Sequence, residues 1–321
     1  MILSFAPMEG VTSSVFRSVH ARLFPGADKY YTPFIAPDRS GDFKNALLRG
    51  MLPENNRGVR LVPQILANDA YAFLHVARQA ADLGYGEVNL NLGCPSATVV
   101  SKHKGAGMLR DLAALDAFLS DVYSRAPLAV SVKTRLGFSS TDEIDALMDV
   151  YRAYPISELI VHARDREGFY KSAPDYDAFA RALSRAPFPV VYNGNLFTAA
   201  DLQRLCARFP SLDAFMLGRG AAANPALFRV LRGGEALRLD ELRGFHEALC
   251  EAYLASGLSS QFAASRMKEH WYYMISLFSD CARPYKALLK ARDLRELKSR
   301  AAIVFESCPF DGSRGFQPPQ G

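Results

Sequence analysis

One cysteine of the chain stands where a proton donor would be useful. Cys94 closely follows the apolar run 88–92 and lies three residues after Asn91. A free thiol is mostly protonated at neutral pH, so Cys94 can act as a general acid. No histidine is near it in sequence and no protease motif surrounds it, which argues against a nucleophile. A buried, inert cysteine is the alternative, and the residues alone leave it open.

The carboxyl ends of the apolar runs carry mostly polar residues. Polar groups are costly to bury unless they find partners, so a set of them that converges would form a binding pocket. Lys133 needs an anionic partner such as a reduced flavin, unless its amine reaches solvent. His162 alone would be interpreted as a structural core residue. The residues at these ends are Pro7, Met8, Gln64, Asn91, Lys133, His162, Asn193 and Gly218.

Two glycine-containing loops have the composition of a phosphate site. They are Asn193-Gly194-Asn195 and Gly218-Arg219-Gly220. Glycine lets backbone N–H groups approach an anion, and Arg219 can add a charge-assisted hydrogen bond. The second loop also fits the G-x-G-x-x-A pattern of dinucleotide folds, but it lies late in the chain and lacks the acidic strand end of that pattern. Simple tight turns are a third interpretation.

Eight short apolar runs must position these residues, and they alternate with stretches of helical period over residues 1–234. This alternation predicts parallel strands joined by right-handed crossovers. Eight such units predict an α/β fold, a (β/α)8 TIM barrel, with its active site at the carboxyl ends of the strands. The runs are Ile2–Pro7, Tyr30–Phe34, Val59–Ile65, Val88–Leu92, Leu128–Lys133, Leu159–His162, Val190–Asn193 and Ala214–Leu217.

The alternation ends at Arg232-Gly233-Gly234. Residues 235–308 have helical periodicity and predict a C-terminal all-helical domain. Its basic residues interleave with aromatic ones, as in many nucleic-acid-binding surfaces, although a core-facing aromatic stripe with a solvated face gives the same pattern. Residues 309–321 are rich in turn formers and are expected to be a flexible tail. The interleaved residues are Arg266, Lys268, Trp271, Tyr272, Tyr273, Tyr285, Lys286, Lys290, Arg292, Arg295, Lys298 and Arg300.

Composition excludes several classes of protein. The chain of 321 residues is 49% hydrophobic and carries a net charge of +5, which permits a polyanionic partner without requiring one. No apolar run reaches the ~18 residues of a membrane helix, and the first residues lack a signal-peptide pattern. Five cysteines without a C-x-x-C pair predict neither disulfides nor a zinc site. We therefore expect a cytoplasmic, monomeric protein that binds no metal and no membrane.

Taken together, the motifs resemble those of the dihydrouridine synthases. The matching segments follow one another in family order across residues 1–234, and residues 235–308 resemble the family's RNA-binding domain more loosely. Asn195 stands where an acidic residue is frequent, and Pro95–Lys104 is more basic than in some subfamilies, so no single position-specific subfamily fits. The segments are Ala6–Thr12, Gln64–Leu66, Asn91–Ser96, Gly105–Leu109, Val132–Gly137, Val161–Arg164, Asn193–Asn195 and Leu217–Gly220.

The resemblance implies a reaction and a role for each matched residue. It implies an FMN-dependent oxidoreductase that uses NADPH to reduce the C5=C6 bond of uridines in tRNA, with Cys94 as the acid that protonates C5. Asn91 would contact the target base. The implied flavin-binding residues are Pro7, Met8, Glu9, Gln64, Lys133, His162, Asn193, Gly194, Asn195, Gly218 and Arg219. The expected RNA contacts are Lys102, Lys104, Arg135, Arg164 and Lys171.

Two other functions remain open from the sequence. A flavin barrel that reduces or oxidises a free pyrimidine, like the dihydroorotate and dihydropyrimidine dehydrogenases, would share the barrel motifs but has no need of a basic helical domain. An RNA-binding protein without catalytic activity would keep that domain but would not take up a flavin. The sequence does not predict which uridine is modified, or whether the RNA is transfer or ribosomal.

Overall fold

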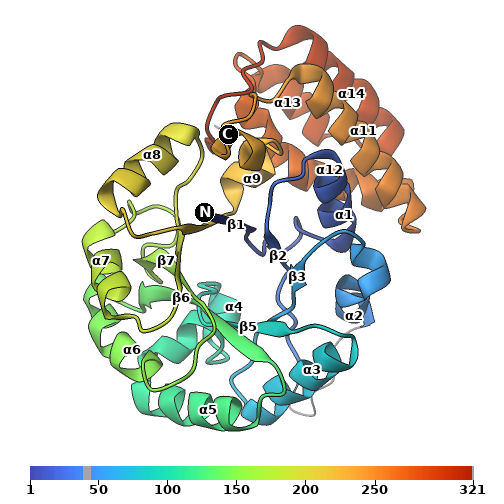
Figure 1. Ribbon diagram of the computed structural model, residues 1–321. Helices are drawn as coiled ribbons and strands as arrows, with labels where there is room; N and C mark the ends of the chain where they lie inside the picture. Colours follow the sequence, from blue (N-terminus) through green and yellow to red (C-terminus); the bar gives the residue numbers. More distant parts are fainter. Residues whose placement is uncertain (39–44, 320–321) are drawn as a thin grey trace.

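The computed structural model describes residues 1–38 and 45–319, and its centre is a barrel of parallel strands (Figure 1). The strands within these residues are β1 (Ile2–Phe5), β2 (Lys29–Tyr31), β3 (Leu61–Val62), β4 (Gln64–Ile65), β5 (Glu87–Asn91), β6 (Ala129–Gly137), β7 (Leu159–Asp165), β8 (Val190–Asn193) and β9 (Ala214–Leu217). They form one sheet in the order β3-β2-β1-β9-β8-β7-β6-β5-β4. The predicted β/α barrel is confirmed.

The third predicted strand is divided in two at Pro63. β3 pairs with β2 at one end of the sheet, and β4 pairs with β5 at the other. Proline has no N–H group and a fixed φ, so strand pairing is interrupted there. Since Pro63 joins β3 to β4 directly, the chain itself connects the two ends of the sheet. The nine segments therefore occupy eight strand positions of a closed barrel.

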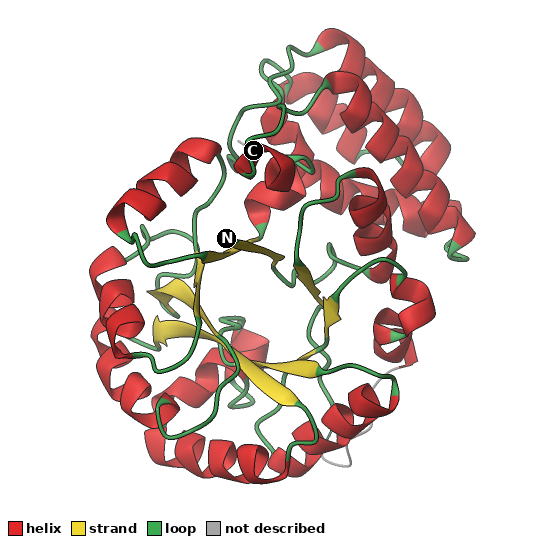
Figure 2. Cartoon of the chain, viewed as in Figure 1, coloured by secondary structure: helices red, strands yellow, loops and turns green. Residues whose placement is uncertain are grey.

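Helices surround the strands on the outside (Figure 2). Those of the barrel are α1 (Ser14–Leu23), α2 (Asn45–Met51), α3 (Ala70–Asp82), α4 (Ala97–Val100), α5 (Leu112–Arg125), α6 (Ile144–Tyr151), α7 (Tyr176–Arg185), α8 (Ala199–Arg208), α9 (Arg219–Ala223) and α10 (Leu227–Leu231). Short 3₁₀ helices are η1 (Pro53–Asn56), η2 (Gly105–Arg110) and η3 (Thr141–Glu143).

Several helices begin at side chains that cap them. Asp69, Asp111 and Asp175 accept hydrogen bonds from backbone N–H groups in the first turns of α3, α5 and α7. Thr198 and Asp201 form a capping box at the start of α8. Each cap satisfies an N–H group that has no partner within the helix. The loops after the strands therefore end at defined residues, which fixes the positions of the side chains they carry.

The interior of the barrel is filled. Seven buried side chains, six from the strands and Ala6 from the residue after β1, pack together inside it: Ala6, Tyr31, Val62, Ile160, Val191, Ala214 and Met216. At the amino ends of the strands, Lys29 lies 3.2 Å from Glu158 and 3.3 Å from Glu87. Tyr31 donates a 2.8 Å hydrogen bond to Glu158. These groups close the end of the barrel opposite the carboxyl ends of the strands.

A helical C-terminal region packs against α1. It contains α11 (Leu239–Ala255), α12 (Ser260–Met274), η4 (Ile275–Leu277), α13 (Ala282–Leu289) and α14 (Leu294–Ser307). Phe16 of α1 stacks on His270 of α12 and meets Phe245 of α11 edge to face. The buried apolar side chains of this region and of the barrel form one continuous cluster. The helices are therefore held at a fixed place beside the barrel.

The structure corrects the expectation that the chain has no disulfide. Cys281 and Cys308 are joined by one, with their Cα atoms 5.5 Å apart. The two residues are 27 positions apart in sequence, and only the packing of α13 against α14 brings them together. Spacing alone gave no signal of this pair. Cys94, Cys206 and Cys250 are free.

Residues 309–319, expected to be loose, return to the barrel. Phe310 pairs with Phe278 in an isolated antiparallel bridge. Phe316 is only 5% exposed and lies against Phe197. Among the described residues, no helix combines the length and apolar character needed to cross a membrane.

Candidate active site

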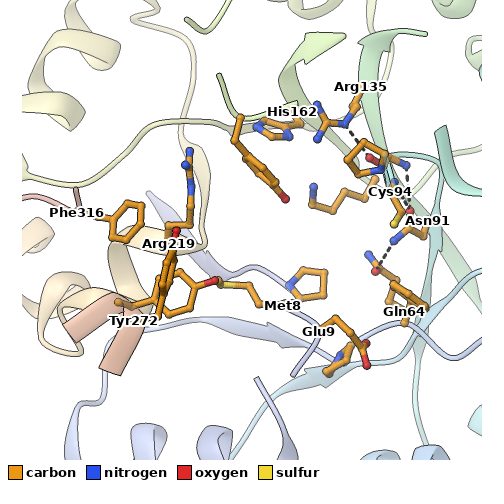
Figure 3. A pocket seen from close by; sticks show the side chains of 18 of the residues that line it. Met8, Glu9, Gln64, Asn91, Cys94, Arg135, His162, Arg219, Tyr272 and Phe316 are labelled. Carbon is orange, nitrogen blue, oxygen red and sulfur yellow. Dashed lines mark hydrogen bonds between the residues drawn. The ribbon is translucent and has the colours of Figure 1, made fainter. Parts of the chain in front are cut away.

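A pocket of about 570 Å³ opens at the carboxyl ends of the strands. Its walls come from the barrel loops, from α12 and from the segment after α14 (Figure 3). The lining residues are Pro7, Met8, Glu9, Pro33, Phe34, Gln64, Asn91, Gly93, Cys94, Pro95, Lys133, Arg135, His162, Tyr170, Lys171, Arg219, Tyr272, Tyr273, Phe316 and Pro318. Cys94 and Arg219 lie on opposite sides of it.

A chain of amides leads to the thiol side of the pocket. Asn89 Nδ2 donates to Ser131 Oγ at 2.9 Å, and Asn89 Oδ1 accepts from Gln64 Nε2 at 2.8 Å. Gln64 Oε1 accepts from Asn91 Nδ2 at 2.8 Å. Asn91 Oδ1 then accepts from the backbone N–H of Cys94 at 2.9 Å. Each link fixes the orientation of the next amide, so Cys94 is held by a network that reaches deep into the barrel.

Cys94 is a partly buried thiol at the edge of this network. Burial raises its pKa above the usual value, while Arg135 and Lys133 act in the opposite direction. The thiol is therefore protonated at neutral pH, with cations nearby that stabilise the thiolate left after proton transfer. Gly105, at φ +56°, passes so close that a Cβ there would lie 2.9 Å from the Cys94 carbonyl oxygen. The tight approach requires glycine and holds the Cys94 loop.

Strands β6 and β7 are longer than predicted, so Arg135 and Arg164 lie on strands and not on loops. β6 continues to Gly137 and β7 to Asp165, because backbone pairing persists beyond their apolar runs. Residues two apart on a strand face the same side, so Arg135 faces the pocket with Lys133. Arg135 donates to the backbone oxygens of Gly93 and Asp165, both at 2.8 Å. Arg135 thus belongs to the pocket wall rather than to an outer loop.

The amine of Lys133 has little to compensate its burial in the pocket. Among the residues that the structure describes, none accepts a hydrogen bond from its amine, and no carboxylate pairs with it within 4.0 Å. Burial lowers its pKa to about 7, and the charge of Arg135 contributes to that shift. An anion bound beside Lys133 would reverse the shift.

A second network lies at the opposite side of the pocket. Arg164 donates to His162 Nε2 at 3.1 Å and to Asn195 Oδ1 at 3.0 Å. Arg219 donates to the same Asn195 oxygen at 2.9 Å. Burial and the nearby arginines hold the pKa of His162 well below its usual range, so the ring is neutral. Because Nε2 accepts from Arg164, the ring proton is on Nδ1.

The remaining predicted residues lie around this second network or outside the pocket. Asn193 donates to the Met216 carbonyl oxygen at 2.8 Å. Gly194 packs against Tyr192, and Gly218 against Ala6 and Met8. Arg164 is 1% exposed, so it cannot form the surface RNA contact that the sequence suggested. Lys104 donates to the Pro37 carbonyl oxygen at 3.0 Å, and Lys102 is exposed; neither lines the pocket.

Sequence reasoning missed the aromatic residues of the pocket. Tyr170 and Phe316 were not expected there, while Tyr272 and Tyr273 were considered either as part of an RNA-binding surface or as a core-facing stripe. Phe316 lies on a segment whose composition suggested a loose tail. Tyr170 precedes the expected RNA contact Lys171 and lies near Arg219, whose guanidinium carbon is 4.7 Å from its ring centroid. The tyrosines could have been found from the basic residues near them in sequence. No sequence signal indicated that Phe316 lies in the pocket.

The pocket is strongly cationic. Lys133, Arg135, Lys171 and Arg219 line it, whereas Glu9 is the one carboxylate among its described lining residues. Burial raises the pKa of Glu9, and Glu269 adds to that effect. Cations without carboxylate partners are costly to hold together unless an anion joins them. The pocket is therefore suited to an anionic ligand with an apolar portion that can lie on Met8 and the aromatic rings.

Comparison with known proteins identifies similar chains. The model of the dihydrouridine synthase (Dus) family matches residues 4–297. A tRNA-dihydrouridine(16) synthase of Pseudomonas putida is 30% identical over 331 aligned residues, which cover 96% of this chain and 99% of that protein. A protein with the same description from Ralstonia nicotianae is 33% identical over 240 residues, covering 72% of each chain. The tRNA-dihydrouridine synthase B of P. putida is 29% identical, covering 84% of this chain and 82% of that one.

Solved structures share the barrel with this chain. Morphinone reductase superposes with a TM-score of 0.53 over 74% of this chain and 87% of its own, at 12% sequence identity. A variant of NCR from Zymomonas mobilis superposes with a TM-score of 0.51 at 15% identity, over 72% of this chain and 86% of its own. At such identities the likeness concerns the fold alone.

Proposed function

The chain belongs to the dihydrouridine synthase family, and on that premise we propose that it reduces the C5=C6 bond of specific uridines in tRNA to dihydrouridine. The proposed flavin is FMN and the proposed reductant is NADPH. The observation that carries the proposal is the presence, in one pocket, of a protonated thiol and a group of cations that have no carboxylate partner among the described residues. Neither feature alone would distinguish a reductase from an anion-binding protein.

The pocket residues fit a phosphorylated flavin. Lys133 has no partner among the described residues and would meet the electron-rich N1 and O2 edge of the ring. Arg219, the neutral His162 and the glycines of the two loops would hold the phosphate, with Asn193 and Asn195 supporting them. Pro7, Met8 and Glu9 would line the ring, and Gln64 would contact its polar edge. When bound and reduced, FMN supplies the hydride that adds to C6 of the base.

Cys94 would complete the reduction by giving a proton to C5. Its raised pKa keeps the proton on sulfur until the base accepts it. Asn91 holds the backbone of the Cys94 loop, and its remaining N–H can reach the base. Lys133 and Arg135 then stabilise the thiolate, which takes a new proton from water.

RNA would reach the pocket with its target base turned outward. Lys171 lies at the rim of the pocket, with Lys102 and Lys104 on a neighbouring loop. The helical segment 235–308, proposed to be the RNA-binding domain, adds Arg266, Lys268 and Tyr272 beside Glu9. Such contacts to phosphate and shape are typical of structured RNA. We propose that the protein acts as a monomer in the cytoplasm, where its tRNA substrate resides.

The direct test supplies purified protein with NADPH and tRNA that carries no dihydrouridine. We expect protein-bound FMN and the formation of dihydrouridine in the RNA. Cys94→Ala should retain flavin and tRNA binding but lose at least roughly 10²-fold in turnover, because the proton donor is missing. Cys206→Ala is the control, since that free cysteine lies on α8 and does not line the pocket.

Other outcomes would point elsewhere. Faster flavin reoxidation by free uracil than by tRNA would indicate an enzyme for free pyrimidines. Protein that binds tRNA but takes up no FMN would indicate an RNA-binding protein without this catalysis. Full turnover by Cys94→Ala would remove Cys94 from the mechanism and leave the family assignment intact.

A further inference from the structure

The segment after α14 is anchored before it reaches the pocket. Its first residue follows Cys308, which is bonded to Cys281 of the preceding helix pair. The Asp311 N–H donates to the Leu277 carbonyl oxygen at 2.9 Å, and Asn224 Nδ2 donates to the Gly312 carbonyl oxygen at 2.9 Å. A Cβ on Gly312 would overlap the Leu237 carbonyl oxygen, so the chain passes there in close contact. These contacts fix the course of residues 309–312.

The anchored segment places Phe316 in the wall of the pocket. The Phe316 ring lies 5.7 Å from the ring of Phe197, 5.6 Å from Tyr273 and 6.3 Å from Tyr272, measured between centroids. Figure 3 shows Phe316 beside Arg219 and Tyr272, across the pocket from Cys94. Phe316 is therefore enclosed between the loop after β8 and helix α12.

Three rings from three separate segments surround the guanidinium of Arg219. Its central carbon lies 4.7 Å from the ring centroid of Tyr170, 5.4 Å from that of Phe197 and 5.5 Å from that of Phe316. Its Nη2 donates to Asn195 Oδ1 at 2.9 Å. An arginine between aromatic faces keeps its charge and its free N–H donors while its rotamers are restricted. No carboxylate pairs with Arg219 within 4.0 Å in the part of the chain that the structure describes.

We propose that Phe316 is a positioning residue that holds the Arg219 guanidinium toward the pocket, so that it meets the phosphate of a phosphorylated ligand. This inference rests on the proposed function, since FMN is the phosphorylated ligand proposed above. It assigns to residues 309–319 a part in cofactor selection. The contact would distinguish FMN from riboflavin, which has the same ring and no phosphate.

The test compares the affinities of FMN and riboflavin for the flavin-free full-length chain, measured by quenching of flavin fluorescence. Phe316→Ala should weaken FMN binding roughly three- to thirty-fold, the range of a lost cation–π contact, and change riboflavin binding less than about two-fold. Phe316→Leu keeps the volume without the aromatic face and should show the same selective loss. Phe316→Tyr should bind FMN like the wild type.

Two further variants test whether Phe316 acts by positioning Arg219 or only by packing in the pocket wall. In an Arg219→Met background, Phe316→Ala should cause no additional loss of FMN affinity, because the group it positions is gone. Phe262→Ala is the matched control, since that ring is 67% exposed and lies outside the pocket. Equal losses for FMN and riboflavin, or additive losses in the Arg219→Met background, would overturn the inference. Wild-type protein that binds neither flavin would instead refute the proposed function.

Discussion

The Oδ1 atom of Asn91 accepts a 2.9 Å hydrogen bond from the backbone N–H of Cys94 and a 3.0 Å bond from that of Gly93. Both lone pairs of this oxygen are therefore used inside the protein. Asn91 was expected from the sequence to touch the substrate base. Its geometry shows that the oxygen instead shapes the loop that carries the thiol, so one N–H of the amide is left for the base.

Replacing Asn91 should affect catalysis more than cofactor binding. Asn91→Leu removes the acceptor for both N–H groups, so we expect turnover to fall roughly 10²-fold, as misplacement by about an ångström can cause. Flavin affinity should change little, which a titration would show beside single-turnover rates. Asn91→Asp keeps the acceptor oxygen and should retain more activity than Asn91→Leu. Equal activity of the two variants would contradict this role.

Gly105 and Gly84 offer a matched pair for the loop of Cys94. Both have positive φ, but a Cβ on Gly105 would lie 2.9 Å from the Cys94 carbonyl oxygen, whereas one on Gly84 meets nothing within 4 Å. Each alanine substitution should cost about 1–2 kcal/mol of unfolding free energy from backbone strain. Gly105→Ala should also lower turnover, as measured with dihydrouridine formation, while Gly84→Ala should not. Unchanged turnover in Gly105→Ala would show that the loop tolerates displacement.

The amine of Lys133 should leave a pH signature on stability. Its pKa in the folded protein is lowered from 10.5 to about 7, so between these values the unfolded chain binds more protons and stability rises with pH. Below pH 7 the fold must bury a charged amine. Lys133→Met should therefore stabilise the flavin-free protein most below pH 7, with the gain fading toward pH 10.

Urea unfolding at both ends of this range measures the effect. Lys290→Met serves as the control, since that lysine is exposed. A stability difference between Lys133→Met and the wild type that does not change with pH would contradict the lowered pKa.

The disulfide between Cys281 and Cys308 should contribute measurably to stability. Closing a chain segment of this length is worth roughly 3 kcal/mol through the unfolded state. Cys281→Ser and Cys308→Ser should lower the midpoint of thermal unfolding, and a reductant should lower it in the wild type but not in these two variants. Cys206→Ser, in a free cysteine, should respond to reductant like the wild type. A wild type insensitive to reductant would mean that the bond does not form in solution.

The fold was largely predictable because its strands are apolar runs between loops. β8 and β9 coincide with the predicted runs Val190–Asn193 and Ala214–Leu217. The prediction was wrong where residues that pair as a strand are charged rather than apolar. β6 and β7 continue through Arg135 and Arg164, which pair as strand residues although they are charged, and both arginines were therefore placed on loops.

The residues of the site were predictable where the barrel topology fixes their position. They were not predictable where the site is formed by segments that are distant in sequence. Cys94, Gln64 and Lys133 follow from strand ends, since parallel strands bring these ends to one rim. The contact of Phe316 with Arg219 joins two segments that are far apart in sequence, and no sequence pattern predicts that they meet. The same holds for the Cys281–Cys308 pair, which depends on how two helices pack.

The filled interior of the barrel and the ion pairs of Lys29 close the barrel at the amino ends of its strands, and this has a consequence for kinetics. With that end closed, the nicotinamide donor and the RNA proposed above would both reach the pocket from the carboxyl ends of the strands. If both use the same pocket they would bind in turn, and each product would leave before the next reactant binds. Initial-rate plots against one substrate at several levels of the other should then be parallel lines, whereas lines that intersect would require both to be bound at once.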